Sequence, residues 1–159
     1  FNNIFNKLSK IDEIPGAKDF LKINKLTKSK LKNDLSECAA VNGKTSYKLA
    51  RFICYLYNIN VVLIEGNIFH KIIIDYEEKY NIITITDDGE YKFKMDVENI
   101  DDIKDKYYEV EDFDKKIKGI GYYKADELVG IANKLGIDTS MKRVKTELFK
   151  MIKIALKED

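Results

Sequence analysis

The chain has 159 residues, of which 45% are hydrophobic and 35% charged, and a net charge of +1, so it can bury the core of one domain or of two small ones. No apolar run approaches the ~18–20 residues that cross a bilayer, and no secretory leader is visible, so we expect an intracellular protein without a membrane partner. Two cysteines and one histidine, without a CxxC motif, argue against a disulfide framework and against a zinc site.

Helical periodicity dominates the first third of the chain. Short helices are expected near residues 1–10 and 17–24, followed by a clearer helix that Thr27 or Ser29 can cap. A further helix is expected to begin at Thr45 or Ser46. Each of the two later helices carries one apolar stripe, formed by Leu31, Leu35, Cys38 and Ala39 in the first and by Leu49, Phe52, Ile53, Leu56 and Tyr57 in the second. These segments predict an N-terminal helical pair.

The period then changes to that of strands. Four strands are predicted, with β-branched or alternating sequences, at residues 60–66, 68–75, 82–88 and 91–96. Asp88-Gly89 is a strong hairpin signal between the last two. In the fourth, Tyr91, Phe93 and Met95 share one face and Lys92 and Lys94 the other. Short links between the strands favour a small antiparallel β-meander.

The segment after the strands is acidic and leads to a joint. Its first half, from residue 100, suits a helix, and Tyr107 to Val110 suits an extended segment. Residues 116–121, KIKGIG, form a glycine-containing joint. We therefore expect an α+β body over 1–116 and a separate helical module over 117–159.

Two amphipathic helices are predicted in that C-terminal module, at residues 123–135 and about 144–157. Ile137, just past Gly136, can fold back to close the end of the first helix. The facing apolar residues are Leu128, Ile131, Ala132 and Leu135 in the first helix and Val144, Leu148, Met151, Ile152 and Leu156 in the second. A hairpin built this way leaves its loop and the cationic start of the second helix outside the core.

Three short stretches of this hairpin resemble the SAP-like family of helix–extension–helix modules: Ala125-Asp126-Glu127-Leu128, Leu135-Gly136-Ile137 and Lys145-Thr146-Glu147-Leu148. The resemblance covers about 35 residues. It implies accessory binding of DNA, usually double-stranded, with little sequence specificity. Where the family often has a glycine before its lysine, this chain reads TSMKR over residues 139–143. Lys, Asn, Ile and Tyr are abundant, whereas the chain has one Pro and no Trp, a bias typical of an AT-rich genome. Together with such a hairpin on a small α/β body, this bias looks like that of proteins of large DNA viruses, in which case a virion location is expected.

Electrostatics also favours phosphate binding at the start of the second C-terminal helix. A helix N-terminus offers unpaired N–H groups and a partial positive charge, both suited to phosphate. The cations expected around the start of the second helix are Lys142, Arg143 and Lys145, with a hydroxyl from Thr146 or Ser140 and with Lys124 heading the first helix. Charge is distributed accordingly, because residues 1–48 and 115–159 each carry net +5 and residues 49–114 carry −9. The other interpretation is that these charges are solvated and the basic ends pack on the acidic middle.

The hairpin pattern recurs in the N-terminal third. Residues 26–58 can be laid over the C-terminal hairpin so that Leu31 matches Leu128 and Leu49 matches Leu148. Lys44 and Lys48 surround the start of the second N-terminal helix. Two weak basic sites could then act together through avidity. The alternative is two unrelated amphipathic hairpins.

Signals for catalysis are weak. Cys38, His70 and Asp75 occur in the order of several cysteine proteases, and the helix-then-strands arrangement over 44–96 is similar to papain-like and OTU-type cores. Cys38, however, lies on the apolar stripe of its helix, and Gly89-Glu90-Tyr91 stands where an OTU-type enzyme places a histidine before an aromatic residue. No Walker loop, dinucleotide fingerprint or EF-hand spacing is present in the sequence. The acidic run from Asp101 is expected to be a charged face, not a Mg²⁺ or Ca²⁺ site.

The sequence therefore predicts an α+β protein that binds nucleic acid without catalysis and without a cofactor or metal. Its partner is expected to be double-stranded DNA, and the expected phosphate-binding residues are Lys124, Lys142, Arg143, Lys145 and Thr146. The first alternative is a structural protein, such as a minor virion component, that docks on other proteins through an exposed apolar patch around Tyr55, Tyr57 or Phe113. The second is a degenerate cysteine-protease-like fold. Because the sequence begins FNNIF, without Met, a fragment of a longer protein is also an expectation.

Overall fold

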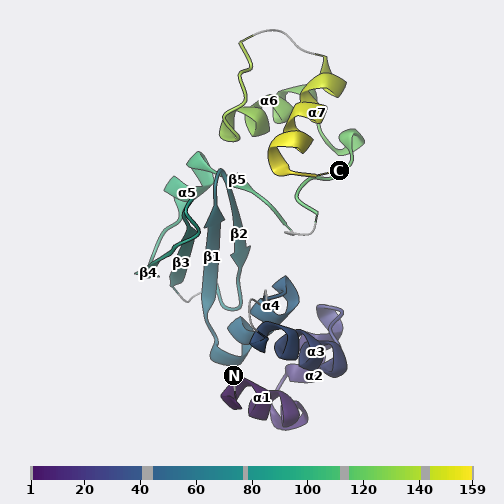
Figure 1. The fold of residues 1–159 in the computed structure, drawn as a ribbon, viewed down its shortest axis with the longest axis vertical. Coiled ribbons are helices and arrows are strands. Elements are labelled where there is room, and N and C mark those ends of the chain that lie inside the picture. The colour runs from purple at the N-terminus through teal and green to yellow at the C-terminus, as the bar shows by residue number, and fades with distance from the viewer. Residues whose placement is uncertain (1, 41–44, 77–78, 112–114, 141–143, 159) are drawn as a thin grey trace. The chain divides into compact units, whose positions relative to one another are not determined.

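The computed structural model describes residues 2–40, 45–76, 79–111, 115–140 and 144–158. Contacts divide the chain into two compact units, residues 1–58 and residues 59–159. The first unit is helical, and the second combines a mixed sheet with helices (Figure 1). The α+β class is therefore confirmed. The predicted boundary between residues 116 and 117 lies within the second unit.

The first unit contains the predicted helical pair and two shorter helices before it. Its elements are α1 (Asn2–Ser9), the 3-10 turn η1 (Ile11–Glu13), α2 (Ala17–Ile23), α3 (Lys28–Ala39) and α4 (Tyr47–Tyr57). Thr27 begins α3 because its hydroxyl oxygen accepts a hydrogen bond from the N–H of Lys30 at 3.2 Å. Ser46 caps α4 in the same way, accepting from the N–H of Leu49 at 3.1 Å. Of the two cap residues predicted for each helix, Thr27 caps α3 and Ser46 caps α4.

A core of leucines and aromatic residues holds this unit together. Its buried side chains are Leu8, Ile11, Ala17, Leu26, Leu31, Leu35, Leu49 and Phe52. Tyr55 stacks on Phe20 with ring centroids 4.0 Å apart, and its hydroxyl donates to the carbonyl of Pro15 at 2.9 Å. Tyr55 is therefore engaged within the unit. Tyr57 is more exposed, and Lys7 lies over its ring at 4.1 Å from the centroid.

The second unit contains a five-stranded sheet in the order β4-β3-β1-β2-β5, with β1 between β3 and β2 (Figure 1). Its strands are β1 (Asn60–Glu65), β2 (Ile68–Ile72), β3 (Tyr80–Ile85), β4 (Tyr91–Val97) and β5 (Tyr108–Glu109). β1 pairs antiparallel with β2 but parallel with β3. The predicted antiparallel meander is thus wrong, although all four predicted strands are present, and the segment expected to be extended near residue 108 supplies a fifth.

The buried side chain of Asn60 accounts for this topology. After β2 the chain returns beside the start of β1 and continues into β3 on the other side. Asn60 Oδ1 accepts hydrogen bonds from the N–H groups of Ile74 at 2.8 Å and Asp75 at 3.1 Å, and Asn60 Nδ2 donates to the carbonyl of Asp75. Asn81 Nδ2 donates to the carbonyl of Asn60 at 3.2 Å. The crossing segment is thereby bonded to the first residue of β1, and a parallel β3 follows.

One face of the sheet packs on α5 (Asp101–Lys106). Val62, Ile64, Phe69 and Ile82 form a core there with Ile100, against which Ile103 and Tyr107 pack. Alternation places every second residue of each strand on this face, which is why Val62 and Ile64 point the same way.

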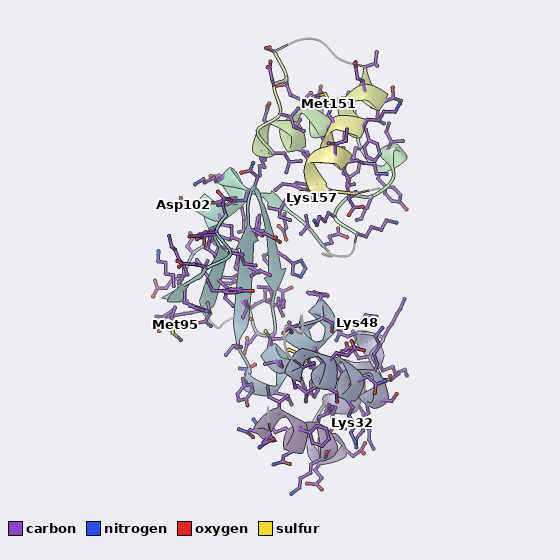
Figure 2. The ribbon with its side chains drawn as sticks, in the orientation of Figure 1. Lys32, Lys48, Met95, Asp102, Met151 and Lys157 are labelled. Atoms are coloured by element: carbon purple, nitrogen blue, oxygen red, sulfur yellow. The ribbon has the colours of Figure 1, made fainter. Side chains whose placement is uncertain are left out.

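The edge strand β4 is exposed on both faces. It forms the predicted hairpin with β3 across Asp88-Gly89, where Gly89 has a φ of 82°. The predicted alternation is present, with Phe93 paired to Ile83 and Lys92 to Thr84. Phe93 and Met95 are 69% and 71% exposed, and Figure 2 shows Met95 at the margin of the sheet. The strand therefore presents an apolar stripe formed by Tyr91, Phe93 and Met95.

Candidate nucleic-acid interface

The two C-terminal helices pack together as predicted. They are α6 (Ala125–Lys134) and α7 (Lys145–Leu156). Of the predicted apolar faces, Leu128, Ile131, Ala132, Leu135, Leu148, Ile152 and Leu156 are buried. Two residues of the predicted faces lie outside this buried core. Met151 is half-buried, and Val144, at 67% exposure, is the residue that precedes α7.

The end of α6 is closed by a Schellman motif. Gly136 has a φ of 74°, and its N–H donates to the carbonyl of Asn133 at 3.1 Å. The N–H of Ile137 donates to the carbonyl of Ala132 at 2.9 Å, and the Ile137 side chain packs on the hairpin core. The prediction that Ile137 folds back across Gly136 is confirmed. This closure fixes the direction in which the chain leaves α6.

The hairpin shares its core with the rest of the second unit. Ile68 of β2, Val110 after β5 and Ile117 of the predicted joint are buried among the helix side chains. Lys116 Nζ donates to the carbonyl of Leu156 at 3.0 Å, and the N–H of Lys116 donates to Glu158 Oε1 at 2.6 Å. Segment 115–118 is therefore fastened to the end of α7 and is not a free linker.

The sequence predicts a phosphate site at the N-terminus of α7. Val144 precedes the helix and has no polar side-chain atom, so its side chain cannot cap the first-turn N–H groups. The N–H groups of Glu147 and Leu148 bond back to the carbonyl of Val144 at 3.0 and 3.1 Å, and those of Lys145 and Thr146 precede them at the helix start. Lys145 is half-buried and Thr146 is exposed. Two of the five predicted contact residues thus adjoin each other at a helix start.

The other three predicted residues have different outcomes. Lys124 is exposed and precedes α6, so it heads a different helix. Asp126 and Glu127 occupy the first turn of that helix, and Glu127 Oε2 accepts from the N–H of Lys124 at 2.6 Å. Carboxylates there disfavour phosphate. Lys142 and Arg143 lie outside the described residues.

The N-terminal pair differs from the C-terminal hairpin at the matching position. The start of α4 corresponds to the start of α7, but Ser46 caps it, and the Ser46 hydroxyl also donates to Asp34 Oδ2 at 2.6 Å. A carboxylate next to a capped helix start repels phosphate. In the pair formed by α3 and α4, the start of the second helix therefore offers less to an anion than the start of α7 does.

The residues of the protease alternative have structural contacts. His70 is buried in β2, and its Nδ1 donates to the carbonyl of Val110 at 2.6 Å. Cys38 lies in α3 of the first unit, with its Sγ 3.0 Å from the hydroxyl oxygen of Thr45. The backbone of Asp75 is held by Asn60. These contacts give each residue a role in its own unit.

Several acidic side chains of the central region are paired with lysines. Lys104 bonds to Asp101 at 2.8 Å, Lys71 to Glu109 at 2.9 Å and Lys118 to Glu111 at 2.8 Å. The Lys104 ammonium holds the pKa of Asp101 below its usual value, with help from Asn99. Among the described residues, no group of three or more potential metal ligands comes together.

The four tyrosines between α5 and α6 divide into two kinds. Tyr108 and Tyr123 pack half-buried against the hairpin core, and Tyr107 packs against the sheet core. Burial raises the pKa of Tyr108 far above its usual value, and hydrogen bonding to Tyr123 adds to the shift. Tyr122 differs from these three, because it is 77% exposed on the 3-10 turn η2 (Ile120–Tyr122) that precedes α6.

Within the part of the chain that the structure describes, no helix has the length and apolar character of a membrane span. No family model, curated protein or solved structure matches the chain.

Proposed function

We propose that this chain binds nucleic acid without catalysing a reaction, through the SAP-like hairpin of α6 and α7, and that its partner is double-stranded DNA contacted with little sequence preference. The observation that carries the proposal is the uncapped start of α7 beside Lys145 and Thr146. The helix supplies a partial charge of about +0.5 there, and the backbone donors point outward.

Rigidity of the support strengthens the proposal. The buried core of the hairpin, the closed end of α6 and the fastening of Lys116 to Leu156 hold α7 in place. A phosphate bound at its start would meet donors that are already oriented, so little conformational entropy is lost on binding. Lys142 and Arg143 immediately precede this start in sequence and are assigned to the same phosphate cluster.

Contacts of this kind read the backbone and not the bases. Each neutralised phosphate releases counterions. A plot of the logarithm of the binding constant against the logarithm of the salt concentration therefore has a slope of about −0.9 for each phosphate contact on duplex DNA. Binding should therefore weaken steeply with salt and differ little between sequences.

The test is fluorescence anisotropy of a labelled blunt duplex over a salt series. The variant Lys142→Gln/Arg143→Gln/Lys145→Gln should bind more weakly at low salt, with a salt slope smaller by about 2 to 3. The matched control is Lys92→Gln/Lys94→Gln/Lys106→Gln, which removes the same charge from exposed positions on β4 and α5. Equal losses in the two variants, or no binding of the wild type at low salt, would overturn the proposal.

The stripe of Tyr91, Phe93 and Met95 favours a second candidate, a structural protein that docks on another protein. Their exposures of 62%, 69% and 71% place three large apolar side chains on one face of an edge strand. This is a different patch from the one predicted around Tyr55 and Tyr57, and Phe113 lies outside the described residues. A photo-crosslinking amino acid placed at position 93, with one at exposed Lys18 as control, would identify such a partner.

A further inference from the structure

A cavity of about 550 Å³ opens beside α6, between the segment 115–123 and β5. Three tyrosines and four lysines contribute to its lining, together with three glutamates, Gly130 and Ile131. The lysines are Lys115, Lys116, Lys118 and Lys134, the tyrosines Tyr108, Tyr122 and Tyr123, and the glutamates Glu109, Glu111 and Glu127. We call this cavity the tyrosine–lysine groove.

Gly130 has no structural reason to be glycine. It lies in the interior of α6, where glycine costs about 1 kcal/mol relative to alanine. A Cβ added there would meet no atom of the described residues within 4 Å, and Gly130 is not among the positive-φ glycines of that part of the chain. Neither packing nor backbone conformation therefore requires glycine. Because Gly130 lines the groove, its effect is to keep that wall flat and open to the close approach of another molecule.

Tyr122 supplies an aromatic face at the groove. The turn that carries it is fixed by the N–H of Tyr122, which donates to the carbonyl of Gly119 at 3.0 Å. Its ring is 77% exposed, with Lys118 Nζ at 6.0 Å from the ring centroid. Beside it, the hydroxyl of Tyr123 accepts from the N–H of Lys118 at 3.0 Å. An exposed ring on an ordered turn is a surface on which a flat aromatic ligand can stack.

The charges of the groove favour an anion beside that face. Each of its three glutamates has a partner: Glu109 has Lys71, Glu111 has Lys118, and Glu127 has the N–H of Lys124. Lys115, which is exposed, belongs to the four lysines of the lining, so cations outnumber carboxylates there. A ligand that joins a planar ring to a negative group satisfies both features.

We propose that the tyrosine–lysine groove binds an unpaired nucleotide, with its base stacked on Tyr122 and close to Gly130 and its phosphate near Lys115. The inference rests on the proposed function, since nucleic acid held at the start of α7 is the source of such a nucleotide. It adds to that function a preference for duplexes that carry a single-stranded extension.

The expected effect is a gain in affinity from the extension. A duplex with a tail of unpaired thymidines should bind about 5- to 150-fold more tightly than the same blunt duplex, the range for one base stacked on one aromatic side chain. Anisotropy of both labelled duplexes with the full chain measures this ratio directly.

Two variants test the groove without disturbing the helix start. Tyr122→Ala removes the stacking face, and Gly130→Gln fills the open wall while giving α6 a better helix former. In both variants the tailed duplex should bind about as tightly as the blunt duplex, and the affinity for the blunt duplex should be unchanged. Gly130→Gln should also unfold at a higher temperature, which separates loss of binding from loss of folding. The control Tyr76→Ala, at an 88% exposed tyrosine, should keep the full gain.

The outcomes separate this inference from the proposed function. No gain from the tail, or a gain that survives both variants, overturns the groove assignment even if blunt duplex binds normally. If only the variant at Lys142, Arg143 and Lys145 loses blunt-duplex binding, the result supports the phosphate site at the start of α7 and leaves the groove to be judged by the tail's gain. Competition by millimolar thymidine monophosphate that abolishes the gain supports the groove with a free nucleotide as its ligand. A gain that resists this competitor supports a nucleotide within a strand.

Discussion

Asn60 binds the backbone of Asp75 from both sides of its carboxamide, accepting from one N–H and donating to one carbonyl. Asn60 is completely buried at the first position of β1, and Asp75 lies in the segment that crosses from β2 to β3. These hydrogen bonds hold the crossing segment beside the start of β1. The sheet therefore has β1 at its centre, antiparallel to β2 on one side and parallel to β3 on the other.

Removing that carboxamide should destabilise the second unit strongly. Asn60→Ala leaves the N–H groups of Ile74 and Asp75 without their acceptor, and buried unsatisfied donors cost about 1–3 kcal/mol each. We expect the free energy of unfolding to fall by about 2–4 kcal/mol, measured by urea denaturation. Asn81→Ala, which removes a single bond to the carbonyl of Asn60, should cost about 1 kcal/mol or less. Equal losses in the two variants would contradict this role for Asn60.

A second prediction concerns the closure of α6. Gly136 has a φ of 74°, a conformation that costs a residue with a Cβ about 1–2 kcal/mol. Gly136→Ala should lower the free energy of unfolding by about 1 kcal/mol, although the added Cβ would meet only Asn67 Nδ2, at 3.7 Å. Gly119→Ala is the matched control, because Gly119 has a φ of −61° and open space around it. A loss in the control as large as in Gly136→Ala would show that positive φ is not the cause.

Local structure in this chain was predictable where a few adjacent residues determine it. Thr27 and Ser46 cap the helices they precede, Asp88-Gly89 turns between β3 and β4, and Ile137 closes α6. Each of these features depends on hydrogen bonds or dihedral angles within about six residues.

The order of the strands was not predictable by the same means. Alternation tells which residues share a face but not which strand lies alongside, so short links suggested a meander. The determining contact joins Asn60 to Asp75 across 15 residues of sequence, and an asparagine before a β-branched run is equally typical of a simple strand boundary.

The candidate site was predictable in part. Lys145 and Thr146 lie at a helix start, as their sequence context predicts. The carboxylates beside Lys124 were visible in the sequence, but the hydrogen bond from the Lys124 N–H to Glu127 depends on the conformation of the helix start. The tyrosine–lysine groove was missed, although a single glycine inside a helical pattern, Gly130, was a signal that could have indicated it.

A third prediction concerns stability at high pH. Burial raises the pKa of the Cys54 thiol from its ordinary 9.0 to about 11, against a smaller opposing effect of Arg51. Because the folded-state pKa is the higher one, the unfolded chain loses its thiol proton first as pH rises. The contribution of Cys54 to the free energy of unfolding is therefore fully present below pH 9 and is lost between about pH 9 and 11. The total loss is about 2–3 kcal/mol.

The measurement is urea denaturation at several pH values over that range, in reducing buffer. Other groups, tyrosines and lysines among them, also titrate there, so the wild type is compared with Cys54→Ala, which shares all of them. The variant should be less stable below pH 9, and the difference should shrink by pH 11. A difference that stays constant with pH would show that Cys54 titrates alike in both states.

The last prediction concerns the dependence of the C-terminal hairpin on the sheet. Ile68 and Val110 are 8% and 1% exposed within the hairpin core, so a fragment of residues 115–159 would lose both side chains while keeping Lys116 and its bonds to Leu156 and Glu158. Burying an aliphatic side chain contributes about 1.5–3 kcal/mol, and 1 kcal/mol shifts the melting temperature of a small domain by about 4–8 °C.

We therefore expect the 115–159 fragment to melt at least about 10 °C below a 59–159 fragment, as followed by circular dichroism. The substitution Val110→Ala should lower the melting temperature of the longer fragment alone, because the shorter one lacks the residue. Met95→Ala, at a 71% exposed position of β4, should leave the longer fragment unchanged. If the two fragments melt together, the hairpin is an independent module and the boundary belongs near residue 116. If the shorter one melts lower, β2 and the segment after β5 belong to the hairpin's fold, and a phosphate bound at the start of α7 would also stabilise the sheet.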